Sequence, residues 1–288
     1  MTLNKERQAQ WSLSMSRNRK QRPTSRGESS FGKLLAVLIG LAVILAIGSI
    51  FYINMSKVKI EIDPNTLCQV DQKPTDIIAI LIDATEGLPE RAARQASIRI
   101  KQALSSAPEN SLINLYSIKS GNESHIEPIA HICKPSSGEN VSNLTGNKNY
   151  SIKQYKERFL KPLKFQIDNL IDAKSSSTSP LIESMQSAII ESFEANANTG
   201  EKRLIIVSDM IQNTNLYSFY REKPSYKNYN DISAQSGKGI LRLDGIKVEI
   251  LVVARSFPKG TRKDVVDFWS HFLTDKGAAN GSAMEPLL

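Results

Sequence analysis

The sequence predicts an α/β protein with a doubly wound, mostly parallel sheet, preceded by one transmembrane helix. Two short runs, 76–83 (DIIAILID) and 203–209 (RLIIVSD), are largely apolar and rich in β-branched residues. Such runs are typical of strands that helices cover on both faces. Helix-like stretches alternate with strand-like ones along the chain, which is the pattern of parallel strands joined by crossover helices. Residues 34–53 form an uncharged run directly after a basic segment.

This uncharged run (LLAVLIGLAVILAIGSIFYI) predicts a membrane anchor, because a twenty-residue helix is about 30 Å long and matches the hydrocarbon core of a bilayer. A buried helix of a soluble core and a cleaved signal peptide are the alternatives. The run is apolar on all sides and longer than the usual signal-peptide core, which favours an uncleaved anchor.

Charge is concentrated before this anchor. Residues 1–33 contain eight basic and two acidic residues, so they carry +6 of the total net charge of +8. The positive-inside rule then places them in the cytoplasm, and the rest of the chain outside. The remainder is nearly neutral, which argues against nucleic-acid binding. We expect a single-pass protein of a bacterial inner membrane whose C-terminal domain is periplasmic or otherwise extracytoplasmic.

Five segments are expected along the chain. They are a basic, disordered cytoplasmic tail (1–33), the anchor (34–53), a stem (54–75), the α/β domain (76–276) and a loose C-terminal tail (277–288).

Five runs predict strands of the sheet. They are bounded by turn-forming residues, and Pro128 places the third at an edge because proline cannot donate to a sheet ladder. The runs are 76–83, 111–118, 125–133, 203–209 and 246–254.

Four stretches with apolar residues at helical spacing lie between and after these strands. In the second, Pro162 is expected to break or kink the helix. The stretches are 89–108, 150–172, 181–195 and 262–277.

The two cysteines, Cys68 and Cys133, both lie in the part expected outside the cytoplasm, where disulfides persist. Joined, they would close a loop worth about 4 kcal/mol of stability in the chain-entropy model. Two unrelated buried thiols are the alternative.

Polar side chains gather where strands and loops should meet. In open α/β sheets, ligands bind outside the carboxyl ends of the strands. Carboxylate and hydroxyl oxygens suit hard cations such as Mg²⁺, Mn²⁺ or Ca²⁺. The polar residues at these positions are Asp83, Thr85 and Glu86 after the first strand, Thr178 and Ser179 before a helix, and Ser208 and Asp209 at the end of the fourth strand.

These segments resemble the von Willebrand factor A family over residues 75–275, which implies its Rossmann-like fold. Family members hold a metal ion with D-x-S-x-S, a threonine in a second loop and an aspartate after the fourth strand. Here DATEG matches the first segment through Asp83 and Thr85, and Gly87 stands at its last ligand position without a side chain. STSPLIESM and LIIVSDM match the other two, at Ser179 and Asp209.

The resemblance implies a divalent cation, Mg²⁺ first and Mn²⁺ or Ca²⁺ as alternatives, held by these four residues with Glu86 and Thr178 as further candidates. In this family a carboxylate from the partner completes the ion's coordination. The implied function is therefore a membrane-anchored protein-interaction module, not an enzyme, within an envelope complex. An aspartate at a strand end and a Ser-Pro pair also commonly begin helices, so a metal-free scaffold is an alternative.

A metal-dependent phosphohydrolase at the same acidic edge is the enzymatic alternative. A dehalogenase-type phosphatase needs a second aspartate two residues after the first, and position 85 is threonine. The loop 210–243 is rich in aromatic residues, and Tyr217, Tyr220 and Arg221 are candidates for partner contact because such residues are favoured in interface hot spots. Packing of these rings against the sheet is the alternative.

Overall fold

The computed structural model describes residues 30–55, 60–85, 87–119, 126–139, 141, 147–171, 178–196, 200–237 and 241–287. The chain divides into two units, residues 1–59 and residues 60–288.

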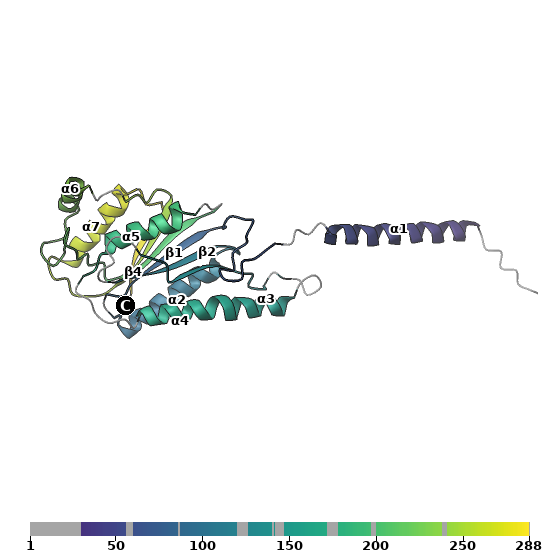
Figure 1. Ribbon diagram of the computed structural model, residues 1–288, viewed down its shortest axis with the longest axis horizontal. Coiled ribbons are helices and arrows are strands. Elements are labelled where there is room, and N and C mark those ends of the chain that lie inside the picture. The colour runs from purple at the N-terminus through teal and green to yellow at the C-terminus, as the bar shows by residue number, and fades with distance from the viewer. Residues whose placement is uncertain are drawn as a thin grey trace, which may run out of the picture. The chain divides into compact units, whose positions relative to one another are not determined.

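The first unit contains helix α1 (Ser30–Met55). Its segment Phe31–Tyr52 is long and apolar enough to cross a membrane, judged by length and composition. The side chains of this segment are exposed on every face. Figure 1 shows α1 as a continuous helix. A helix that is apolar all round has no polar face to turn toward water, which suits a lipid environment.

The second unit is built on a six-stranded sheet with the order β3-β2-β1-β4-β5-β6. All neighbouring strands are parallel except β2 and β3, so the sheet is mostly parallel as predicted. The short β3 lies at one edge, where Pro128 indicated it, although it begins later than expected. The strands are β1 (Ile77–Asp83), β2 (Leu112–Ile118), β3 (Ala130–Cys133), β4 (Lys202–Ser208), β5 (Ile246–Val253) and β6 (Ala283–Leu287).

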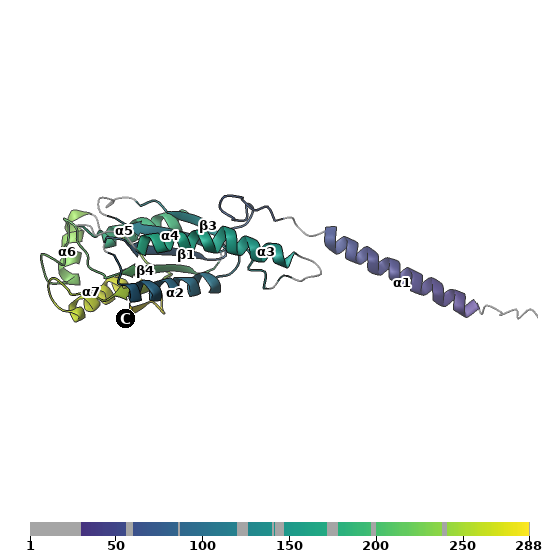
Figure 2. The same ribbon diagram turned by 90° about the horizontal axis from the view of Figure 1, so that it is seen from below.

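Helices cover both faces of this sheet (Figures 1 and 2). On one face lie α2 (Glu90–Ser106), α3 (Lys148–Gln154), the π-helical segment η1 (Tyr155–Leu160) and α4 (Lys161–Ile171). On the other lie α5 (Leu181–Ile189), the π-helical segment η2 (Ile190–Glu194), α6 (Tyr226–Ser236) and α7 (Arg262–Asp275).

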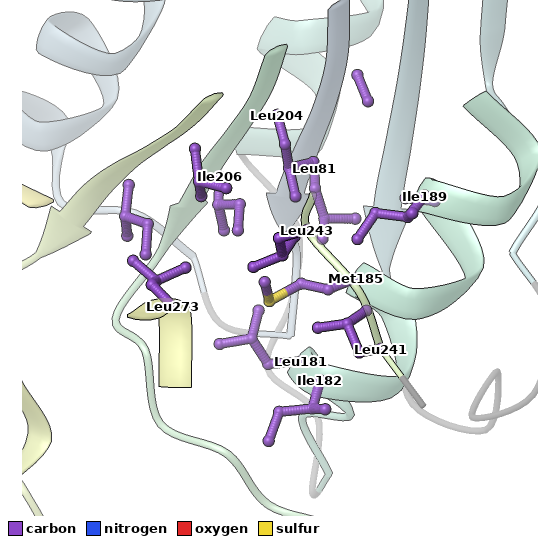
Figure 3. Close-up of a cluster of buried hydrophobic side chains, with 14 of the residues drawn as sticks. Leu81, Leu181, Ile182, Met185, Ile189, Leu204, Ile206, Leu241, Leu243 and Leu273 are labelled. Carbon is purple, nitrogen blue, oxygen red and sulfur yellow. The ribbon is translucent and has the colours of Figure 1, made fainter. Parts of the chain in front are cut away.

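Alternate residues of each strand enter one of two hydrophobic cores. In β1, Ile78 and Ile80 pack with α2 and α4, whereas Ala79 and Leu81 pack with α5 and α7. Figure 3 shows Leu81 among the side chains of α5, including Met185. Every residue of β1 is buried, which explains why its sequence lacks an alternating polar pattern.

Pro162 does not break its helix. The segments α3, η1 and α4 follow one another without a gap, and Pro162 is the second residue of α4. Proline has no N–H to donate to the preceding turn, and the widened π-helical turn η1 lies directly before it. The sequence predicted the position of the irregularity but not its form.

Two further elements were not predicted. Helix α6 lies within the expected aromatic loop 210–243, and it is capped by Ser225, whose side chain accepts from the backbone N–H of Asn228. Strand β6 lies within 277–288, so the prediction of a loose tail is wrong for residues 283–287. Arg99 of α2 forms ion pairs with Glu285 of β6 and Glu249 of β5, which fastens this strand to its neighbours.

The predicted disulfide is present. Cys68 and Cys133 are bonded, with their Cα atoms 4.7 Å apart. The bond joins the segment before β1 to edge strand β3. Residues 60–75, which the sequence suggested as a stem, belong to the same compact unit as the sheet.

Candidate functional site

The strand order places the candidate site at a topological switch point. From β1 the sheet continues to β2 on one side, while β4 on the other side leads on to β5. Crossover connections diverge at such a point and leave a crevice at the carboxyl ends of the two central strands, where ligands of doubly wound sheets bind. Asp83 is the last residue of β1 and Ser208 is the last of β4.

Asp83 is buried and joins three segments of this edge. Its Oδ1 accepts hydrogen bonds from the Thr85 backbone N–H at 3.0 Å and the Thr85 hydroxyl at 2.5 Å. Its Oδ2 accepts from the hydroxyls of Ser179 at 3.2 Å and Ser208 at 2.8 Å. A carboxylate with this many donors stays satisfied away from water, which explains how its burial is tolerated. The structure therefore brings Asp83, Thr85 and Ser179 together, as the sequence indicated.

Backbone pairing holds Ser179 in place. Its N–H donates to the Asn213 carbonyl at 3.1 Å, and the Asn213 N–H donates back at 2.9 Å. Pro180 then leads into α5, so the segment before this helix is fixed beside the loop after β4. Thr178 precedes Ser179 and is half-buried, and Glu86 lies outside the described residues.

Asp209 follows β4 and faces a different partner. Its Oδ1 accepts from the Ile211 backbone N–H at 2.9 Å, and its Oδ2 lies 3.3 Å from Nε of Arg255. Met210, between Asp209 and Ile211 in the chain, has a φ of 63°, a left-handed conformation that costs energy for a non-glycine residue. Its carbonyl accepts from the indole N–H of Trp269 at 2.9 Å, which helps to hold the turn.

Asp83 and Asp209 line one small cavity at this edge. The cavity measures about 10 Å³, which is room for one water-sized sphere. The two carboxylates, 126 positions apart in the chain, are thus gathered at one rim. The described residues that line the cavity are Asp83, Thr85, Leu88, Ser208, Asp209, Val253 and Arg255.

Arg255 is the residue of this site that the sequence-based prediction missed. It lies two positions after the end of β5, and its Nη2 donates to the carbonyl of Gly87 at 2.7 Å. The signal was present, because the rule that collected Asp83 and Asp209 at the carboxyl ends of strands applies to β5 as well. A protonated guanidinium cannot coordinate a cation, so a prediction based on metal ligands does not include Arg255.

The site matches a divalent cation in its oxygen donors but not in its charge. Carboxylate and hydroxyl oxygens are the ligands that Mg²⁺ and Ca²⁺ prefer. Among the residues that the structure describes, however, no three His, Cys, Asp or Glu side chains group as metal ligands. The Arg255 guanidinium lies against Asp209, and arginine side chains remain protonated in proteins. A guanidinium in the same cavity opposes a second cation, so these residues do not fit a divalent metal in this arrangement.

The aromatic residues of 210–243 serve mainly as core. Tyr217 is completely buried and stacks on Phe268 of α7, so it is not available for the partner contact suggested by the sequence. Its hydroxyl donates to the Ser225 carbonyl at 3.0 Å. Tyr220 and Arg221 are both exposed, and Arg221 donates to the carbonyls of Thr214 and Asn215.

A second buried polar cluster lies between β2, β3 and η2. The hydroxyl of Ser192 accepts from the Asn114 amide at 3.0 Å and lies 2.9 Å from the hydroxyl of Tyr116. Burial raises the pKa of Tyr116 to about 12. Nδ1 of His131, an exposed residue of β3, lies 2.8 Å from the Asn114 side-chain oxygen, and partial desolvation of the ring lowers the pKa of this histidine. The cluster joins η2 to the sheet and shares no residue with the small cavity at the edge.

The strand order and covering helices define a doubly wound α/β domain with a hydroxyl- and carboxylate-lined edge. No protein-family model matches the chain, and no curated protein matches it. Similar solved structures include an aerotolerance-related membrane protein from Bacteroides fragilis with multiple mutations to serines, at 9% identity over 72% of this chain and 92% of that one, TM-score 0.33.

Two more similar structures are the SpRpn10 VWA domain and a manganese-loaded TRAP protein from Plasmodium vivax. The first is 10% identical over 74% of this chain and 89% of that chain, with a TM-score of 0.35. The second is 9% identical over 73% of this chain and 66% of that chain, with a TM-score of 0.32. Likeness at these TM-scores is too low to assign a function, and the fold rests on the strand order itself.

Proposed function

We propose that this chain is a membrane-anchored, non-enzymatic protein-interaction protein, whose α/β domain binds a protein partner at the carboxyl-end edge of its sheet. The observation that carries the proposal is the state of this edge. Its oxygens are largely engaged by the protein's own donors, and the cavity they leave measures about 10 Å³. Small-molecule sites are typically about 300–1,000 Å³, so the edge suits contact with a macromolecular surface better than it suits a bound substrate.

The location of the domain belongs to the same proposal. The apolar helix α1 anchors the chain in a bacterial inner membrane, with residues 1–33 in the cytoplasm and the domain in the periplasm, within an envelope complex. The Cys68–Cys133 disulfide supports this placement, because such bonds persist in oxidising compartments. The cluster of basic residues before α1 supports the orientation.

A metal-coupled form of this function has a divalent cation, most simply Mg²⁺, between the edge and a carboxylate of the partner. The gathering of Asp83, Thr85, Ser179 and Asp209 supports it, and the position of Arg255 opposes it. The enzymatic alternative, a phosphohydrolase, predicts turnover of phosphate esters by the purified chain. We expect that the purified chain shows no hydrolysis of phosphate esters that depends on Asp83, so the wild type and Asp83→Ala should give the same result.

Site-specific photo-crosslinking in native membranes tests the proposal. A photoreactive amino acid replaces Ser256, which is exposed and directly follows Arg255 at the edge. The matched control position is Asp244, which is also exposed but lies before β5, at the opposite end of the same strand. We expect a discrete crosslinked protein from position 256 and none from 244. The same products from both positions, or none from 256, would contradict a partner site at this edge.

A further inference from the structure

The positive charge at the edge of the sheet comes from the protein itself. Arg255 contacts the loop after β1 through the Gly87 carbonyl and the loop after β4 through the Asp209 carboxylate. It therefore joins two of the segments that carry the oxygen donors. We propose that the guanidinium of Arg255 is the resident cation of this edge, in place of a divalent metal ion, and that it receives the partner's carboxylate.

Position supports this assignment. Gly87 stands at the position where the D-x-S-x-S motif, which DATEG resembles, has its second serine. Nη2 of Arg255 donates a hydrogen bond to the backbone carbonyl of this glycine at 2.7 Å. Arg255 also lines the small cavity together with Asp83 and Asp209. Arg255 thus contacts Gly87, the motif position that has no side chain with which to bind a metal.

Charge supports the first part of this assignment, the replacement of a divalent ion by the guanidinium. The two carboxylates that line the cavity carry −2, and the guanidinium reduces the sum over the described lining residues to −1. Asp83 is further satisfied by hydroxyl and backbone donors from Thr85, Ser179 and Ser208. A divalent ion would have to enter beside a fixed positive charge that is already paired with Asp209.

The remaining exposure of Arg255 gives it access to a ligand. Its side chain is 27% exposed, whereas that of Asp209 is only 10% exposed. The planar guanidinium has five N–H donors and matches a carboxylate in paired geometry. Carboxylate capture by Arg255 rests on the proposed function, because it requires a protein partner that presents an acidic side chain at this edge. Partner binding at this edge then needs no added metal.

Metal titration of the purified full chain in detergent tests the assignment. Mn²⁺ serves as the probe, with isothermal calorimetry and the Mn²⁺ electron paramagnetic resonance signal as readouts. We expect no Asp83-dependent binding by the wild type at millimolar Mn²⁺. Arg255→Ala should bind Mn²⁺ at least 10-fold more tightly than the wild type, and the double variant Asp83→Ala/Arg255→Ala should lose that binding. Arg255→Lys, which keeps the charge, should behave as the wild type does.

Wild-type binding as tight as that of Arg255→Ala would overturn the assignment, and so would Arg255→Ala without any gain. If Arg255→Ala fails to fold, Arg255→Gln removes the charge at similar size and is measured in its place. A rise in melting temperature with Mn²⁺, seen in the neutral variant alone, is the independent readout.

Crosslinking from position 256 with and without a chelator separates this inference from the proposed function. Crosslinks that persist in chelator support both, and loss of them in Arg255→Ala supports carboxylate capture by the guanidinium. Crosslinks that require Mg²⁺ overturn the inference and leave the partner site intact. Absence of crosslinks under all conditions, with the metal titration as expected, refutes the partner site and the capture step while the resident-cation assignment stands.

Discussion

Removing the Cys68–Cys133 disulfide is expected to lower the stability of the α/β unit substantially. The bond closes a loop with a sequence separation of 65 residues. For a loop of this length the chain-entropy model gives a loss of about 4 kcal/mol in the free energy of unfolding. With a urea dependence of about 2 kcal/mol per molar, the unfolding midpoint should fall by about 2 M.

Pulse proteolysis across a urea gradient measures this midpoint for the full chain in detergent, because a brief protease treatment digests only the unfolded unit. The wild type is compared with and without dithiothreitol, and with the double variant Cys68→Ala/Cys133→Ala. The reduced wild type keeps both sulfur atoms, so it separates loss of the covalent bond from loss of side-chain packing at the buried Cys133. A midpoint shift on reduction below about 0.5 M would refute the loop-closure reasoning, since only about 1 kcal/mol would then be at stake.

Three further predictions concern stability. Leu81→Ala should lower the free energy of unfolding by about 2–5 kcal/mol, because Leu81 is completely buried and truncation leaves a cavity; a urea-midpoint change within error would contradict the described packing. Tyr116→Phe should cost about 1–2 kcal/mol through the lost hydrogen bond to Ser192, and the Ser192→Ala/Tyr116→Phe double variant should cost less than the sum of the single changes. Hydrogen bonds from Lys223 and Thr261 lower the pKa of Asp264 to about 2. This lowered pKa means that the carboxylate's contribution is present above pH 3.8 and is lost as the pH falls toward 2, so the stability difference between wild type and Asp264→Asn should vanish over that interval; a difference independent of pH from 5 to 2 would contradict it.

The central strands were predictable because their burial is complete. Every residue of β1 and β2 is buried, so both strands are largely apolar in sequence, with Asp83 at the end of β1 and Asn114 and Ser117 within β2 as the polar exceptions. The edge strand β6 has no such signal, since it is short, half-exposed and contains Pro286. Its place depends on pairing with β5 and on the ion pairs of Arg99, which are contacts distant in sequence.

The acidic residues of the edge were predictable because parallel strands deliver their carboxyl ends to the same side of a sheet. That rule gathered Asp83 and Asp209 without knowledge of any contact. Ser179 precedes helix α5 instead, and the resemblance of STSPLIESM to the family's second metal-binding segment indicated it. The same rule also places Arg255 just after the end of β5, but it does not predict the pairing of Arg255 with Asp209, because that contact depends on the direction in which the arginine side chain extends. The burial of Tyr217 could not be predicted from the sequence either, because an aromatic residue in a loop has the same sequence signature whether it packs inward or outward.

The hydrogen bond between the Trp269 indole and the Met210 carbonyl makes this tryptophan an intrinsic fluorescence probe of the edge. Trp269 is fully buried, and its indole N–H ends on the carbonyl next to Asp209. Any rearrangement of that turn, whether caused by a bound protein or by replacement of Arg255, alters the environment of the indole. Emission wavelength and the indole nitrogen's NMR resonance should therefore report occupancy of the edge without an attached dye, once Trp11, the other tryptophan in the chain, is replaced by phenylalanine.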